Sequence, residues 1–362
     1  MNRLRMVVVG TGALGRHHAR ILSQNPAVEL VAVADSNEVS AQAVAQACRT
    51  QWVTDHRELL LAEQIDAAVI AVPTFAHLDV ASDFLRRRIP VLVEKPLASN
   101  LEQAQCLVDL AEEQQTMLQV GHIERFNPAF QSARPLIREP RYIRSERYSP
   151  YAFRSTDIGV VHDVMIHDLD LVLQLVDSPL KRDGGVEAFG ITILGGHEDC
   201  VQVRLRFENG CIADLSANRV SPETKRDMQA WSADGCVQIN FAKCEVVCYS
   251  SSDLLRFGTS PLEKARQPGT NIEQLKQDVF GKYLKVDRPT VTSQDQLTVE
   301  LASFIDAVRD NRPPVVDGTQ ALLAMRVANE ILEAVARHQW NGSAWGPIGP
   351  DASLPQRRKL AG

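Results

Sequence analysis

The sequence predicts an α/β protein: an N-terminal domain built on a parallel sheet, then an α+β domain with a large, mostly antiparallel open sheet. Up to about Gln119, short β-branched runs alternate with helical stretches, which is typical of a parallel sheet with crossover helices. From Val186 to Tyr249, apolar runs are separated by short turns instead. That spacing indicates strands joined as hairpins.

Five apolar runs define the expected parallel sheet, and helical stretches lie between several of them. The runs are MVVVG (6–10), LVAVAD (30–35), AAVIAV (67–72), PVLVEK (90–95) and MLQVG (117–121). We therefore expect the first domain to span residues 1–121.

The second domain is expected to span residues 122–340, with 341–362 as a tail. It begins with a Pro- and Arg-rich connection, followed by a helical stretch around Asp163 to Val176 and then by six expected strands, at 186–194, 200–207, 211–218, 228–233, 236–241 and 244–249. Glu208-Asn209-Gly210 and Asp234-Gly235 are hairpin turn signals. Two late helices, Thr298 to Arg309 and Gly318 to Arg337, are apolar at helical spacing and should pack back on the fold. A sheet with helices on one face leaves the other to be covered, so we expect a homodimer or homotetramer.

Composition narrows the class of partner. The chain has 362 residues, of which 44% are hydrophobic, and a formal net charge of −6, which gives no long-range attraction for nucleic acid. Its apolar runs stay short of the roughly 18 residues of a membrane helix, and Met1 leads directly into a strand pattern, so we expect a cytoplasmic protein away from membranes. The seven scattered cysteines form no Cys-x-x-Cys pair; we expect reduced thiols and no metal site.

A glycine-rich loop follows the first expected strand: Gly10-Thr11-Gly12-Ala13-Leu14-Gly15. In this context Gly10 permits a tight turn, Gly12 lets the backbone approach a pyrophosphate, and Gly15 lets the helix, expected from about Ala13, pack against the strand. The helix N-terminus offers N–H groups and a positive dipole to phosphates. The loop predicts a dinucleotide-binding Rossmann domain.

Asp35 ends the second apolar run, twenty residues after Gly15. A carboxylate at this position accepts hydrogen bonds from the ribose hydroxyls of the adenosine and repels a 2′-phosphate, so the predicted cofactor is NAD. NADP would be tolerated if Ser36 and Asn37 turned to receive its phosphate.

Two further segments end neighbouring strands, and ligands lie beyond the carboxyl ends of parallel strands. They are Val72-Pro73-Thr74 and Glu94-Lys95-Pro96, and we expect both to face the cofactor. Lys95 is the only lysine among the first 180 residues, although a solvated loop charge is the alternative.

These motifs together resemble the glucose-fructose oxidoreductase, inositol dehydrogenase and rhizopine-catabolism family (Gfo/Idh/MocA). The likeness covers nearly the whole chain: the glycine loop, Val72-Pro73-Thr74 with His77, Glu94-Lys95-Pro96, the run from Asp163 to Asp170, and the late helices. It implies an NAD-dependent enzyme that oxidises CH-OH groups, is oligomeric, and uses Lys95, Asp163 and His167 in catalysis.

The chemistry of these three residues agrees with the resemblance. On a helix, Asp163 and His167 lie one turn apart, so the carboxylate can orient the imidazole. His167 would take the proton of a substrate hydroxyl while Lys95 polarised its oxygen. One departure from the family is the run 157–162, which is bulkier than the glycine run of many relatives, so the simplest polyols are doubtful substrates.

The substrate is suggested by residues after the first domain. Arg125 and Asn127 are the candidates for substrate binding, and a set of arginines follows: Arg134, Arg138, Arg141, Arg144, Arg147 and Arg154. Guanidinium groups suit a diphosphate, although an exposed face of paired charges is the alternative. The run from Gly121 to Pro128, together with the run from Val164 to Asp170, resembles the family branch that oxidises UDP-N-acetylglucosamine-type sugars at the 3-hydroxyl. An inositol or simple sugar dehydrogenase, or a non-catalytic NAD-binding regulator, stays open.

Overall fold

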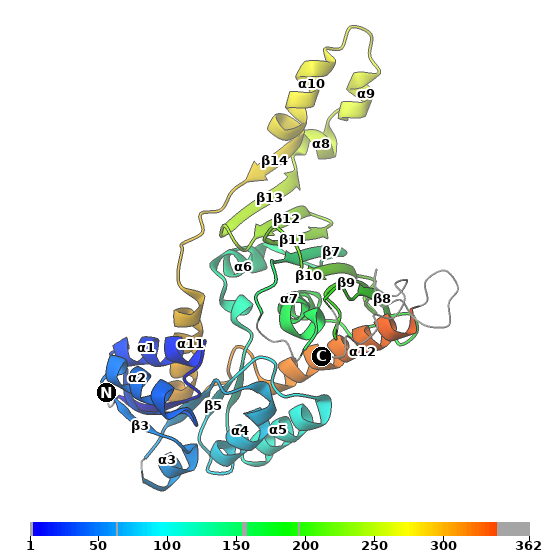
Figure 1. Ribbon diagram of the computed structural model, residues 1–362. Coiled ribbons are helices and arrows are strands. Elements are labelled where there is room, and N and C mark those ends of the chain that lie inside the picture. The colour runs from blue at the N-terminus through cyan, green and yellow to red at the C-terminus, as the bar shows by residue number, and fades with distance from the viewer. Residues whose placement is uncertain (1–2, 63, 154–157, 195, 339–362) are drawn as a thin grey trace. The chain divides into compact units, whose positions relative to one another are not determined.

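The computed structural model describes residues 3–338 except 63, 154–157 and 195 (Figure 1). The chain divides into two compact units. Of the described residues, the first unit contains those up to Phe126 together with Gln294–Val327, and the second contains those from Asn127 to Ser293 and from Ala328 to His338. The division falls at Phe126, whereas the sequence placed it at Gly121.

The first unit is built on a six-stranded parallel sheet in the order β3-β2-β1-β4-β5-β6. The strands are β1 Leu4–Val9, β2 Val28–Ala34, β3 Gln51–Val53, β4 Ala67–Ile70, β5 Val91–Glu94 and β6 Leu118–Gly121. This confirms the doubly wound α/β prediction, with β3 as an additional strand too short for the apolar pattern to indicate.

Helices cover both faces of this sheet because its strands are apolar on both sides. In β1, Met6 and Val8 pack into a core with α1 and α11, whereas Val7 and Val9 pack into a second core with α4, α5 and α12. The helices are α1 Gly15–Gln24, α2 Glu38–Cys48, α3 His56–Ala62, α4 His77–Leu85, α5 Leu101–Glu113, α11 Gln296–Asp310 and α12 Gly318–Arg337. The two late helices appear where the periodicity predicts them, and α12 passes into the second unit at Ala328.

Side-chain caps fix several helix starts. Asn37 accepts a hydrogen bond from the Ser40 amide at the start of α2, Asn100 caps α5, and Asp295 caps α11. Each cap satisfies an amide that has no partner within the helix.

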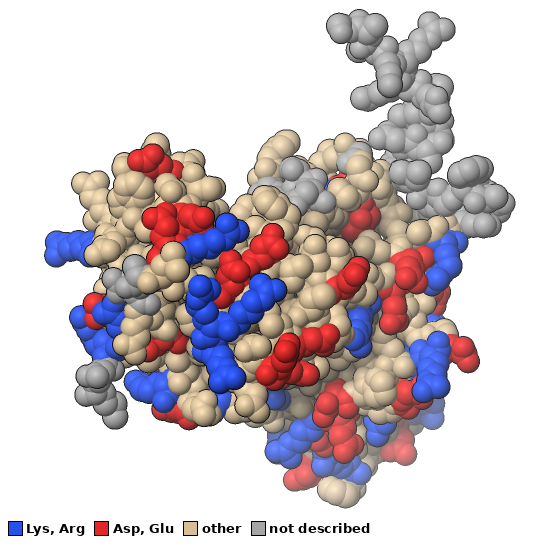
Figure 2. Space-filling view, turned by 90° about the horizontal axis from the view of Figure 1, so that it is seen from below, with Lys and Arg blue, Asp and Glu red and all other residues tan. Residues whose placement is uncertain are grey.

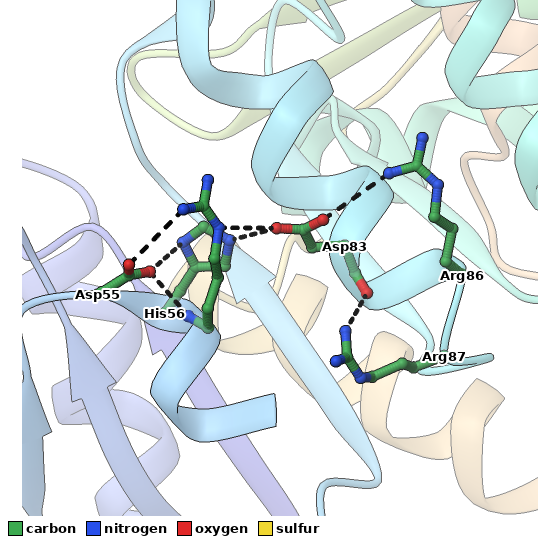
Figure 3. A network of polar contacts seen from close by, with 6 residues as sticks. Asp55, His56, Asp83, Arg86 and Arg87 are labelled. Carbon is green, nitrogen blue, oxygen red and sulfur yellow. Dashed lines mark hydrogen bonds and ion pairs between the residues drawn. The ribbon is translucent and has the colours of Figure 1, made fainter. Parts of the chain in front are cut away.

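Asp83 of α4 is the centre of a polar cluster that joins α3 to α4 (Figure 3). Its carboxylate lies 3.0 Å from Nε2 of His56 and 3.7 Å from Nη1 of Arg86, and the His56 ring stacks on Phe84. Asp55 lies 3.6 Å from Nδ1 of the same histidine. The cluster therefore connects the start of α3 to α4 through polar contacts.

The second unit is built on an eight-stranded sheet in the order β14-β13-β12-β11-β7-β10-β9-β8. Its neighbours are antiparallel except for β7 and β10, which run parallel, so the mostly antiparallel prediction is confirmed. The strands are β7 Tyr142–Tyr148, β8 Val186–Ile191, β9 Cys200–Arg206, β10 Ile212–Asn218, β11 Lys225–Ser232, β12 Gly235–Asn240, β13 Glu245–Ser251 and β14 Leu284–Asp287.

The two faces of this sheet differ in polarity. Helices α6 (Pro128–Ala133) and α7 (Ile166–Val176) pack on one face, where side chains such as Ile143 and Leu215 are buried. The other face carries a ladder of polar pairs. In it, Arg204 donates two hydrogen bonds to Asp214, and Lys225 donates one to Glu146.

Three short helices lie beyond the β13–β14 edge of this sheet (Figure 1). They are α8 Asp253–Phe257, α9 Pro261–Ala265 and α10 Ile272–Asp278, and each contains no buried residue. A capping box between Ser260 and Glu263 starts α9. Local capping rather than an apolar face therefore specifies these helices.

Acidic and basic side chains lie interleaved over the face of the molecule shown in Figure 2. Among the described residues, no helix is both long enough and apolar enough to cross a membrane.

Candidate active site

The glycine loop lies between the end of β1 and α1. The structure shows a different reason for glycine at each of the three positions. Gly10 has φ +91°, and a β-carbon there would lie 2.5 Å from the Ala71 carbonyl oxygen. At Gly15 a β-carbon would lie 1.8 Å from the Gly10 carbonyl oxygen, so the helix and the loop pack too closely for any side chain. At Gly12, by contrast, no atom lies within 4 Å of the β-carbon position. The loop is therefore closed on the protein side at Gly10 and Gly15 and open at Gly12, as the approach of a pyrophosphate requires.

Ala13 and Leu14 form the exposed turn between Gly12 and α1. The helix begins at Gly15, two residues later than predicted, with Leu14 as its N-cap. Leu14 offers no side-chain capping hydrogen bond, which leaves the helix terminus to an external acceptor such as a phosphate.

Asp35 is tied to the glycine loop. Its Oδ2 accepts hydrogen bonds from the Thr11 amide at 2.6 Å and the Thr11 hydroxyl at 2.8 Å, while Oδ1 accepts one from the Asn37 amide at 2.8 Å. The carboxylate is half-buried at the carboxyl end of β2. Its position and charge fit the adenosine ribose of NAD, with the remaining lone pairs available to hydroxyl donors.

Val72, Pro73 and Thr74 follow β4, and His77 fixes this segment to the one that follows β5. The imidazole is buried, with Nε2 3.0 Å from the Val72 carbonyl oxygen and Nδ1 2.9 Å from that of Pro96. Burial lowers the pKa of His77 against the opposing effect of these carbonyls. His77 therefore holds both loops together through its ring, and direct contact with the cofactor stays a prediction.

Glu94 and Lys95 lie where β5 ends, at the same edge of the sheet as the glycine loop and Asp35. Glu94 is 8% exposed, and its Oε1 lies 2.7 Å from Nε2 of His18 on α1. Burial alone would raise the pKa of Glu94, but the hydrogen bond with His18 and the charge of Lys95 hold it below its ordinary value. Glu94 is therefore a buried carboxylate beside the half-buried Lys95.

Arg125 and Asn127 are both buried, at 3% and 1% exposed. Arg125 belongs to the first unit, where Nη1 donates a hydrogen bond to Oε1 of Gln320 at 3.1 Å. Asn127 begins the second unit and caps α6 through the Ala129 amide. Both side chains have structural contacts, and a role in substrate binding stays a prediction.

Asp163 and His167 lie at the start of the α7 helix in the second unit. Residues Val161–Met165 form a wide π-helical turn that continues directly into α7, so the predicted helical stretch begins two residues early. Both side chains are half-buried. The wide turn places them slightly less than one turn apart, close to the predicted arrangement.

Sequence analysis missed the residues that anchor this turn. Glu198 accepts a hydrogen bond from the Val161 amide at 3.0 Å, and its carboxylate occupies the place of a β-carbon at Gly159. Arg219 donates to the Ile158 carbonyl at 2.6 Å and to the fully buried Asp199 at 2.8 Å. Glu198 and Asp199 directly precede β9, Arg219 directly follows β10, and no spacing in the sequence links them to residue 163.

The arginines that follow the first domain differ in their burial and in their partners. Arg147 is buried and donates two hydrogen bonds to Oδ1 of Asp168, while Arg144 pairs with Glu146 on the open face. The exposed paired-charge alternative therefore describes Arg144, whereas Arg147 forms a buried ion pair that neither alternative foresaw. Arg154 lies outside the described residues.

A parallel sheet with an open glycine loop, a carboxylate after β2 and a lysine after β5 defines an NAD-dependent oxidoreductase. The family comparison agrees. Residues 4–122 match the oxidoreductase family with an NAD-binding Rossmann fold, and residues 119–243 match the GFO/IDH/MocA C-terminal domain. The chain belongs to this family.

Within this family, the chain is similar to particular enzymes. The chain is 31% identical over 336 residues to UDP-N-acetylglucosamine 3-dehydrogenase of Acidithiobacillus ferrooxidans, covering 92% of this chain and 98% of the relative. The crystal form of that enzyme in space group P21 superposes with a TM-score of 0.80 over 92% of this chain and 98% of its own. The scyllo-inositol 2-dehydrogenase (NAD(+)) of Bacillus subtilis is 28% identical, covering 61% of this chain and 69% of the relative.

Proposed function

We propose that this enzyme oxidises the 3-hydroxyl of a UDP-N-acetylhexosamine to a ketone, with NAD⁺ as the oxidant. The observation that supports it is the likeness to UDP-N-acetylglucosamine 3-dehydrogenase, which extends over 92% of the chain and therefore includes segments of both units. The inositol dehydrogenase matches a smaller share of the chain, 61%, and stands as the second candidate class.

Three residues carry the proposed chemistry. His167 accepts the proton of the substrate hydroxyl, and Asp163 stabilises the resulting imidazolium. Lys95 donates a hydrogen bond to the same oxygen and stabilises the negative charge that develops on it. Each role matches a group that is half-buried and sits at the end of a strand or the start of a helix.

The glycine loop and Asp35 would hold NAD⁺, with the pyrophosphate at Gly12 and the ribose at the carboxylate. When bound, this cofactor accepts the hydride that leaves the carbinol carbon. Glu94 and His77 fix the two loops beyond β4 and β5.

A nucleotide-sugar substrate needs cationic or amide partners for its diphosphate. We propose Arg125 and Asn127 for this role. Arg147 is not proposed for this role because its guanidinium is paired with the Asp168 carboxylate, whereas Arg125 donates to the neutral amide oxygen of Gln320.

We also propose that the protein is a cytoplasmic homodimer or homotetramer, with the open face of the second sheet as the contact between copies. Helices α6 and α7 pack on the opposite face, and the open face includes Trp231, which is 44% exposed. Size-exclusion chromatography with light scattering measures the oligomeric state, and a monomer would contradict the proposal.

The test of the reaction compares wild type with Lys95→Ala. Each is incubated with NAD⁺ and UDP-N-acetylglucosamine while NADH absorbance is followed and the sugar is analysed by mass spectrometry, because tightly held NADH can hide turnover. We expect the sugar to lose two hydrogens with wild type and none with the variant. Wild-type protein that binds NAD⁺ yet leaves this sugar unchanged would contradict the substrate, and inositols and free sugars would then be tested.

A further inference from the structure

Three buried ionisable side chains of the first unit lie close together behind the end of β5. They are His18 on α1, Glu94 on β5 and Glu300 on α11. His18 and Glu300 are 0% exposed, and Glu94 is 8% exposed. Ionisable side chains are rarely buried unless they are paired, so the burial of these three side chains requires a physical explanation.

Glu94 is the centre of the cluster. Its Oε1 lies 2.7 Å from Nε2 of His18, and its Oε2 accepts a hydrogen bond from the Lys95 amide at 3.3 Å. Gly121, the residue paired with Glu94 across β5 and β6, leaves room for the carboxylate, because a β-carbon there would lie 3.0 Å from Oε2. The carboxylate is therefore held from two sides, by a helix and by the residue that follows it.

Glu300 is buried differently. Neither of its carboxyl oxygens has a hydrogen-bond partner among the residues that the structure describes. Burial, and next the charge of Glu94, raise the pKa of Glu300 well above its ordinary value. Two charged carboxylates in this dry environment would repel each other, so the arrangement is stable with one charge on Glu94 and a proton on Glu300.

We propose that His18 is a positioning residue for Lys95, which it fixes by holding the Glu94 carboxylate, and that the neighbouring Glu300 is a neutral carboxylic acid. The inference rests on the proposed catalytic role of Lys95. The Glu94 carboxylate orients the Lys95 main chain and supplies one negative charge next to the ammonium. Without the His18 hydrogen bond the carboxylate loses its fixed orientation, while burial still favours its protonation.

The test of His18 uses two variants of similar volume. With whichever substrate the wild type oxidises, His18→Leu should lower kcat at least tenfold with little change in KM, and His18→Gln, whose amide can donate to Glu94, should restore most of it. In His18→Leu the acid limb of the kcat/KM profile should move to higher pH, because burial is no longer opposed by the hydrogen bond. A structural role alone would lower the melting temperature of both variants without moving the pH profile, and that result would overturn the proposal.

The charge on Glu300 has its own measurement, independent of turnover. Infrared spectra at neutral pH should show a carboxylic-acid C=O band in wild type that is lost in Glu300→Gln, whose kcat should stay within about twofold because an amide replaces a neutral acid. Glu94→Gln is the matched control and should lower kcat at least tenfold. Identical spectra for wild type and Glu300→Gln would overturn the neutral acid. Full activity of Lys95→Ala would instead contradict the proposed function and leave the infrared result standing.

Discussion

The glycine loop yields a prediction in which two alanine substitutions three residues apart impair different properties, one the stability of the fold and the other the binding of the cofactor. In Gly15→Ala the added β-carbon would lie 1.8 Å from the Gly10 carbonyl oxygen, so the backbone must retreat by about 1.2 Å to reach 3.0 Å. Overpacking of this kind costs about 1–3 kcal/mol, and the upper end applies because the obstructing atom belongs to the backbone. At about 2–4 °C per kcal/mol, the melting temperature should fall by roughly 6–12 °C.

Gly12→Ala is the matched control. Its β-carbon meets no atom within 4 Å, so the melting temperature without cofactor should not fall and should rise by up to about 4 °C, because alanine restricts the unfolded chain. The same β-carbon occupies the space through which the pyrophosphate approaches, and NAD⁺ affinity should fall at least tenfold, or about 1.4 kcal/mol. Differential scanning fluorimetry and calorimetric titration with NAD⁺ measure both effects. Equal melting temperatures for the two variants, or wild-type NAD⁺ affinity in Gly12→Ala, would refute the reasoning.

Three other predictions follow from single contacts. Asp35→Asn keeps an acceptor for Thr11 but removes the charge that repels a 2′-phosphate, so the ratio of NADP to NAD affinity should rise at least tenfold in titrations; an unchanged ratio would contradict the role of Asp35. Arg147→Met leaves Asp168 buried without its guanidinium and should destabilise the second unit by about 3–5 kcal/mol in urea unfolding, whereas Arg147→Met with Asp168→Leu should recover part of that loss. Burial raises the pKa of Glu300 in the folded protein, so above about pH 4.3 the unfolded chain loses a proton that the folded protein keeps. The free energy of unfolding of wild type should therefore fall relative to that of Glu300→Gln as the pH rises. The fall should reach up to about 1.4 kcal/mol per pH unit and should end at the folded-state pKa. Unfolding midpoints from about pH 4 to about pH 8 measure this difference, and parallel curves would contradict it.

Apolar periodicity predicted most of the sheet framework because the buried faces of strands and helices are visible in the sequence as regularly spaced apolar residues. The β-branched runs that end at Asp35 and Lys95 correspond to β2 and β5, and the late helices correspond to α11 and α12. Strand β7 was missed as an element because its alternation is masked by charge: Arg147 faces inward yet is an arginine, buried against Asp168. Burial of a charge depends on a partner 21 residues away, which a local pattern cannot indicate.

The segment between β13 and β14 was missed for a different reason. Helices α8, α9 and α10 bury no side chain, so hydrophobic spacing gives no signal there. Their capping residues Ser252, Ser260 and Asn271 were present in the sequence. For short helices of this kind, the capping residues are the signal in the sequence, because apolar spacing is absent.

In the candidate site, the proposed catalytic residues were easier to predict than the residues that hold their surroundings in place. Lys95, Asp163 and His167 could be proposed from the sequence because each lies in a local motif. The groups that support the neighbouring residues are far away in sequence: His18 lies 76 residues from Glu94, whose carboxylate it contacts, and Arg219 lies 61 residues from Ile158, whose carbonyl it contacts. Apolar contacts tolerate small displacements, whereas a hydrogen bond weakens steeply with misalignment. Directional buried contacts are therefore the means by which this fold can hold reacting groups in position, and substitutions at them should change the rate of reaction more than the stability of the core.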